Sequence, residues 1–219
     1  MNMFIIVYLV VLFSYLFTRF NDNIKYRAIN KYILATMYLV FAFVAFFRKY
    51  EIFSFHILII IALLFTYLGD IFLVFDYFKG GIFFSIANIF FIIYEHIILF
   101  NNGYTFKDIF WVYIVVGIMI SSFVLLCKYK ADVFKLGKMK WPMSLYLFLI
   151  FFNGILGLSL LILLPNTNYV ILGIGALLFM FSDMILTAYK YVFNNNILLI
   201  RANSISYFIG LLLIVLSIV

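Results

Sequence analysis

Long apolar runs separated by short polar breaks dominate the sequence, and this pattern constrains the fold most strongly. An uninterrupted apolar run of about 18 residues or more is typical of a membrane-spanning helix. The runs do not alternate in period two, which excludes a transmembrane barrel, and the helix is then the backbone structure that lipid permits. We therefore predict an all-α polytopic transmembrane bundle of about eight spans. The predicted spans are 3–18, 32–48, 54–77, 81–100, 108–128, 142–164, 169–191 and 196–219.

The composition agrees with this class. Hydrophobic residues make up 68% of the chain and charged residues 11%, whereas soluble domains have about 45–50% and 25%. No break between the runs is long enough for a soluble domain, so residues 1–219 are expected to form a single integral membrane domain.

Several classes of function are excluded at this point. The lone Cys127 excludes a disulfide framework, and two separated histidines, His56 and His96, argue against a metal site. The net charge of +7 lies in breaks between apolar runs, which explains it better than nucleic-acid binding does. We expect no metal, no cofactor and no nucleic-acid partner; the sequence does not indicate an oligomeric state.

The distribution of basic residues predicts an orientation. Odd-numbered breaks hold most lysines and arginines, so the positive-inside rule places these breaks in the cytoplasm and both termini outside. The bias toward Asn, Lys, Ile and Phe is typical of an AT-rich bacterial genome, and we expect a multi-pass protein of a bacterial inner membrane. The odd breaks hold Arg19, Lys25, Arg27, Lys31, Lys79, Lys128, Lys130, Lys135, Lys138, Lys140, Lys190 and Arg201; the even ones hold Arg48, Lys49 and Lys107.

Two aspartates fall inside predicted spans at matching depth. Asp70 and Asp183 each lie a few residues before the cytoplasmic end of an inward-running span, or roughly 10–12 Å from the boundary at about 1.5 Å per residue. Asn88, Asn203 and Tyr207 lie at similar depth on outward-running spans. An ionised side chain at this depth costs at least ~2.5 kcal/mol, so such groups face the bundle interior and are functional candidates. For the asparagines, hydrogen bonding between helices is an equally good explanation.

Glu95 is a further candidate. It follows Asn88 by two helical turns and therefore shares its face, about 10 Å further from the cytoplasmic side. We expect it to line the same pocket, to pair with another residue, or to form a second proton site.

The two aspartate segments resemble each other. Residues 62–73 align with residues 176–186 after one gap, and each is followed in the next span by an Ala-Asn pair. A duplication would divide the chain into halves 1–105 and 106–219 with the same orientation. Chance similarity in an apolar chain is the alternative.

These segments carry a resemblance to the YhhN family of membrane proteins, which includes the animal lysoplasmalogenases. The segment Leu68-Gly69-Asp70-Ile71-Phe72-Leu73 is similar to the family's Gly-Asp motif, and Gly175 to Asp183 is similar to its Ser-Asp motif. Gly80 and Phe84 fit the following span, and residues 207–214 fit the last motif in part.

The chain departs from the family pattern at three positions. Asn88 stands in place of a His, Phe91 in place of a Tyr and Leu211 in place of a Gln. The loss of the His and the Gln implies a change in substrate or rate, whereas both aspartates are retained.

The resemblance implies hydrolysis of the vinyl-ether bond of a lysoplasmalogen, a lysophospholipid, with release of a fatty aldehyde. Paired carboxyl groups suit this reaction, since one can protonate the bond while the other, ionised, stabilises the cation and orients water. The candidate catalytic residues are thus Asp70 and Asp183, with the acid and the base unassigned. The candidate substrate-binding residues are Asn88, Asn203, Tyr207, Ser182 and Glu95.

Two other functions fit the same residues. Acidic groups at one depth in a pseudo-symmetric bundle would also serve a proton-coupled transporter. The loss of the family His would fit a non-catalytic protein that binds membrane lipids.

Overall fold

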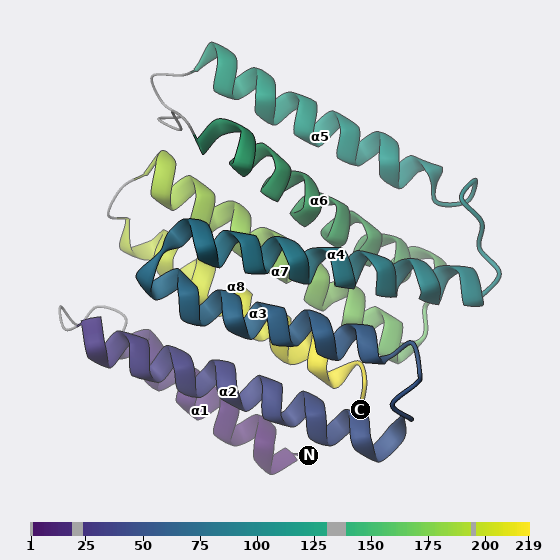
Figure 1. The fold of residues 1–219 in the computed structure, drawn as a ribbon, viewed down its shortest axis with the longest axis horizontal. Helices are drawn as coiled ribbons and strands as arrows, with labels where there is room; N and C mark the ends of the chain where they lie inside the picture. Colours follow the sequence, from purple (N-terminus) through teal and green to yellow (C-terminus); the bar gives the residue numbers. More distant parts are fainter. Residues whose placement is uncertain (1, 19–23, 131–138, 194–195) are drawn as a thin grey trace.

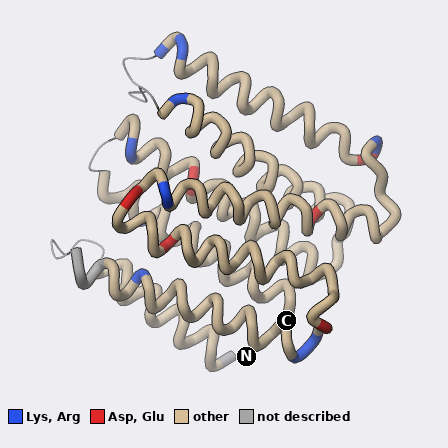
Figure 2. Tube along the Cα trace, viewed as in Figure 1, with Lys and Arg blue, Asp and Glu red and all other residues tan. Residues whose placement is uncertain are grey.

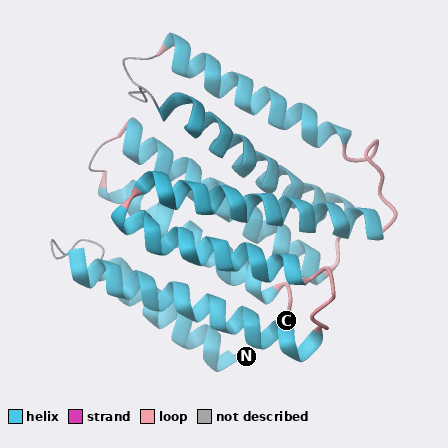
Figure 3. Ribbon diagram, in the orientation of Figure 1, coloured by secondary structure: helices cyan, strands magenta, loops and turns pink. Residues whose placement is uncertain are grey.

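The computed structural model describes residues 2–18, 24–130, 139–193 and 196–219. Every regular element among these residues is a helix (Figure 3), as the continuous apolar runs predict. The helices are α1 (Asn2–Thr18), α2 (Ile24–Lys49), α3 (Ile57–Phe75), α4 (Tyr77–Asn101), α5 (Phe110–Tyr129), α6 (Lys140–Leu163), α7 (Thr167–Tyr191) and α8 (Ile197–Leu216).

Seven of the described helices, α2 to α8, are long and apolar enough to cross a membrane. The remaining helix, α1, is equally apolar but shorter, with 17 residues. The prediction of a polytopic helical bundle is therefore confirmed.

The observed boundaries differ from the predicted ones most clearly at α2. This helix begins at Ile24 instead of residue 32, because the polar residues of its first two turns are still compatible with a helix that emerges from the apolar layer. Lys31, predicted to lie in a loop, is consequently a helical residue. Between α3 and α4, Asp76 ends one helix and caps the next, since its Oδ1 accepts hydrogen bonds from the backbone N–H groups of Phe78 and Lys79.

Six helices pack around a common interior in the order α2, α3, α4, α6, α7, α8 and back to α2. The two others lie outside this ring: α1 packs against α2 and α8, and α5 packs against α6 (Figure 1). The ring positions any residue on its inner face away from lipid.

The same contacts bear on the predicted halves. In the first half, α1 contacts α2, α2 contacts α3, α3 contacts α4, and α4 contacts α6. The equivalent contacts of the second half are α5 with α6, α6 with α7, α7 with α8, and α8 with α2. This is the pattern that a duplicated four-helix half would produce, although the duplication itself stays a prediction.

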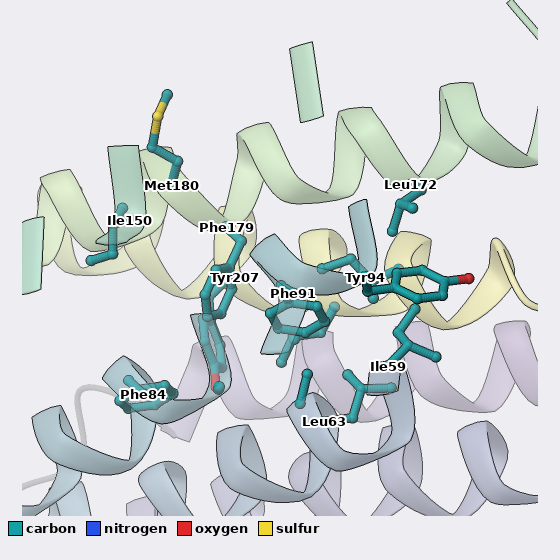
Figure 4. Close-up of a cluster of buried hydrophobic side chains, with 14 of the residues drawn as sticks. Ile59, Leu63, Phe84, Phe91, Tyr94, Ile150, Leu172, Phe179, Met180 and Tyr207 are labelled. Atoms are coloured by element: carbon teal, nitrogen blue, oxygen red, sulfur yellow. The ribbon is translucent and has the colours of Figure 1, made fainter. Parts of the chain in front are cut away.

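Aromatic side chains fill the middle of the ring. Phe179 of α7 lies against Tyr207 of α8, with ring centroids 5.6 Å apart, and against Phe91 of α4 at 6.1 Å (Figure 4). Phe84 meets Tyr207 edge to face at 6.1 Å. Such ring contacts stabilise the bundle in addition to the burial of large apolar surfaces, and they hold α4, α7 and α8 together.

Glycines bring α6, α7 and α8 close to each other, because small residues let membrane helices approach closely. A Cβ atom at Gly157 would lie 2.6 Å from the Cβ of Ala176, and one at Gly175 would lie 2.9 Å from the carbonyl oxygen of Gly210. The separations leave no room for a side chain.

Charged residues concentrate at the helix ends (Figure 2). We call the end where α2, α4, α6 and α8 begin the basic end. Its basic residues include Lys25, Arg27, Lys31, Lys79, Lys128, Lys130, Lys140, Lys190 and Arg201, whereas Arg48, Lys49 and Lys107 belong to the opposite end. That the basic end faces the cytoplasm stays a prediction.

Candidate functional site

Asp70 lies on the inner face of α3 and is surrounded by donors from two other helices. The Nζ of Lys31, on α2, is 2.9 Å from its Oδ1. Its Oδ2 accepts hydrogen bonds from the hydroxyl groups of Tyr207 at 2.7 Å and Tyr38 at 3.3 Å. The carboxyl group is buried, and so is Lys31. Both oxygens of Asp70 are therefore occupied, and its negative charge has a direct counter-charge.

Helix geometry explains this arrangement. Lys31 and Tyr38 are seven residues apart, which is close to two turns, so both side chains reach the same side of α2. Tyr207 comes from α8, which packs against α2 and completes the ring. Asp70 thus links three helices of the bundle.

Asp183 has a much simpler environment. Its Oδ2 accepts a hydrogen bond from the hydroxyl group of Tyr146, on α6, at 3.0 Å. Among the described residues, no lysine or arginine forms an ion pair with it, although its side chain is buried. Each aspartate therefore has a tyrosine partner on the ring helix that precedes its own, Tyr38 for Asp70 and Tyr146 for Asp183. The two carboxyl groups differ in that only Asp70 has a counter-charge.

The two aspartates line one cavity of about 480 Å³ at the basic end. This volume lies within the usual range of small-molecule sites, about 300–1,000 Å³. The walls come from the end of α3, the end of α7 and the beginnings of α2, α4 and α8, with Tyr15 of α1 at the edge. Other lining residues are Ala28, Lys31, Leu73, Val74, Tyr77, Phe84, Leu186, Tyr189, Lys190, Ile200, Asn203, Ser204, Tyr207 and Phe208.

A second lysine lines this cavity. Lys190, in the last turn of α7, is solvent-exposed, and its Nζ lies 3.0 Å from the ring centroid of Tyr77. A cation over an aromatic face is held in place electrostatically. The cavity thus carries an exposed positive charge in addition to the buried pair of Lys31 and Asp70.

The predicted substrate-binding residues divide into two groups. Asn203 and Tyr207 line the cavity with the aspartates. The Asn203 side-chain amide donates to the carbonyl oxygen of Ser182 at 2.8 Å, so it fixes α8 against α7. Ser182 is buried beside Asp183 and donates to the carbonyl oxygen of Phe179, and it is not part of the cavity wall.

Asn88 and Glu95 lie away from the cavity wall. Asn88 donates to the carbonyl oxygen of Phe84 and accepts a hydrogen bond from Asn153 of α6 at 2.9 Å, so it connects helices. Glu95 is fully buried, and its Oε2 has no hydrogen-bond partner in the described part of the chain. A role for either residue in substrate binding stays a prediction.

The sequence did not predict three residues that contact the aspartates, namely Lys31, Tyr38 and Tyr146. The chain has 17 tyrosines, so no single tyrosine stands out. Lys31 directly precedes an apolar run, so the sequence predicts a loop residue at this position. The available signal was the seven-residue spacing of Lys31 and Tyr38, which places a cation and a hydroxyl on one helix face.

Comparison with known proteins gives a family. The model of the YhhN family matches residues 27–218, which include the residues that contact both aspartates. No curated protein and no solved structure shows significant similarity to the chain. Because the family match spans most of the sequence, the chain belongs to the YhhN family.

Proposed function

We propose that the protein hydrolyses the vinyl-ether bond of lysoplasmalogen-type lysophospholipids and releases a fatty aldehyde. One observation carries the proposal: two buried carboxyl groups line the same cavity, one paired with a cation and the other without one. Membership of the YhhN family supports a hydrolase of this kind. The cavity at the end of a membrane bundle suits a substrate with a polar headgroup and an apolar chain.

Asp183 is the proton donor in this mechanism. A buried carboxyl group without a counter-charge is more stable as the neutral acid, because burying an uncompensated charge is costly. Its proton moves to the vinyl carbon that is not bound to oxygen, and the remaining carbon and the ether oxygen then share a positive charge. The Tyr146 hydroxyl, 3.0 Å from Oδ2, stabilises the carboxylate that forms.

Asp70 is the base. Lys31 and the tyrosines hold its carboxylate in a fixed orientation, so it stabilises the cation and accepts a proton from the attacking water. Water adds to the positively charged carbon and gives a hemiacetal. The hemiacetal hydroxyl loses its proton and forms the aldehyde carbonyl group as the bond to the original ether oxygen breaks; that oxygen takes up the proton and leaves as the glycerol hydroxyl. Transfer of the proton from Asp70 to Asp183 restores the starting state.

Lys190 is placed to hold the phosphate of the headgroup. It lines the cavity from its exposed side, and no carboxylate pairs with it among the described residues. Lysine binds phosphate as a point charge, and such a contact tolerates different headgroups.

The experiment uses the purified protein in lipid vesicles, lysoplasmalogen as substrate, and detection of the free aldehyde. We expect Asp183→Asn and Asp70→Asn each to abolish release. Asp76→Asn is the matched control, because Asp76 is exposed between α3 and α4 and asparagine also caps helices. Full activity in either site variant would contradict the mechanism. Absence of aldehyde from the wild type, together with uptake driven by a pH gradient, would favour a transporter.

A further inference from the structure

A second hollow lies beside the cavity of the aspartates. It has a volume of about 530 Å³ and lies between the first turns of α4 and α6, with Ile82 and Ile86 on one side and Trp141 and Leu145 on the other. We call it the α4/α6 groove. None of the described residues that line it is charged.

The groove and the cavity share a wall. Leu73, Tyr77, Phe84 and Leu186 line both of them, so the two spaces are adjacent. Tyr146 lines the groove, and its hydroxyl donates to Asp183 on the cavity side. The groove therefore lies next to the carboxyl group that we assign as the proton donor.

The open side of the groove faces the surroundings of the bundle. Trp141 is 71% exposed and Leu145 is 61% exposed, and both belong to α6, a helix long and apolar enough to span a membrane. Around such a helix the medium is the alkyl chains of lipids, and an uncharged groove open to them takes up an alkyl chain in preference to a polar ligand.

We propose that the α4/α6 groove binds the alkenyl chain of the lysolipid and thereby selects substrates by chain length. The inference rests on the proposed function and adds a second subsite to it. With the headgroup in the cavity and the alkenyl chain in the groove, the vinyl-ether bond lies at the boundary between the two spaces, close to Asp183. The carbon that receives the proton is the one on the chain side of that bond, which is the side of the groove.

Chain burial has a measurable consequence. For a lysolipid supplied to the protein as a monomer in water, each methylene group that enters the apolar groove is worth roughly fourfold in binding. Lengthening the chain is therefore expected to lower KM stepwise until the groove is full, after which further methylenes have no effect.

Gly81 offers a variant that fills the groove without disturbing the fold. It lines the groove, and a Cβ built on it meets nothing within 4 Å, so Gly81→Phe is expected to project a ring into the space. Gly117→Phe is the matched control, since Gly117 of α5 is equally open and lies outside the groove. Gly81→Phe should raise KM for a long-chain lysoplasmalogen by roughly tenfold or more, as expected if at least two methylenes lose their site. KM for a short-chain substrate should stay unchanged.

A binding measurement separates this inference from the proposed function. A non-hydrolysable alkyl lysolipid with a photoreactive chain should label peptides containing Ile82 or Trp141 in the wild type and in Gly117→Phe, and should fail to label them in Gly81→Phe. Labelling of other parts of the protein would overturn the inference, as would equal labelling by a diacyl phospholipid probe. An equal change for long and short substrates in Gly81→Phe would also overturn it. If the wild type releases no aldehyde but the probe still labels the groove, the proposed reaction is refuted and the binding site for the alkyl chain is retained.

Discussion

Replacing Lys31 with methionine removes the counter-charge of Asp70 at nearly constant side-chain volume. The Nζ of Lys31 is 2.9 Å from the Asp70 carboxylate, and the two side chains are 10% and 1% exposed. Removal of one partner from a buried ion pair costs about 3–5 kcal/mol, because an uncompensated charge remains. For a chain of this size, 1 kcal/mol shifts Tm by about 2–4 °C, so we expect Lys31→Met to lower Tm by roughly 6–20 °C.

The assay is thermal unfolding of the purified protein in detergent, followed by intrinsic fluorescence. Lys79→Met is the matched control: Lys79 pairs with Asp76 at 3.9 Å, but the side chains are 64% and 42% exposed, and exposed pairs contribute at most about 1 kcal/mol. The double variant Lys31→Met/Asp70→Asn removes both charges, so it should be more stable than the sum of the two single losses predicts. Equal Tm values for Lys31→Met and Lys79→Met, or strictly additive losses in the double variant, would refute the reasoning.

Two further variants test the site and the packing. Tyr146→Phe removes the described hydrogen-bond partner of Asp183; hydrogen bonds to charged groups are worth about 1.5–3 kcal/mol, so kcat should fall roughly 10- to 150-fold at constant KM. Tyr8→Phe, which removes a hydroxyl bonded to a backbone carbonyl group, should keep the wild-type kcat, and an equal fall in both variants would speak against a role in the reaction. Gly157→Ala forces a Cβ into the α6–α7 contact and should cost about 1–3 kcal/mol of stability, measured as a lower Tm, whereas Gly117→Ala fills open space and should leave Tm unchanged or raise it.

The sequence predicts the helices well because the membrane imposes a strict rule on them. Apolar runs of sufficient length must be helical in lipid, and polar breaks end them. The predicted boundary is furthest from the observed one where that rule is weak. The first turns of α2 are polar, so hydropathy assigns them to a loop although the helix continues to Ile24.

The aspartates were predictable because a carboxyl group inside an apolar run is costly and therefore conspicuous. Counting residues from the span ends placed Asp70 and Asp183 in one layer, and the structure brings both to one cavity. For Asn88 the same counting left two explanations open, since depth along a helix does not specify the direction of a side chain. Asn88 accepts a hydrogen bond from Asn153 of α6, as the explanation by contacts between helices requires.

The partners of the aspartates depend on which helices are neighbours, and the sequence does not reveal this. Tyr38 and Tyr146 reach their aspartates only because α2 packs against α3 and α6 packs against α7. The α4/α6 groove depends on the contact between the two halves of the chain. Contacts of this kind arise from packing and not from local residue patterns.

The most direct test of the account is hydrolysis of a lysoplasmalogen in deuterated water, followed by mass spectrometry of the aldehyde. Protonation of the vinyl carbon by Asp183, whose proton exchanges with solvent, predicts an aldehyde with one deuterium on the carbon next to the carbonyl group, and no such product from Asp183→Asn. Release of an unlabelled aldehyde, or of the labelled aldehyde by Asp183→Asn at the wild-type rate, would contradict the account.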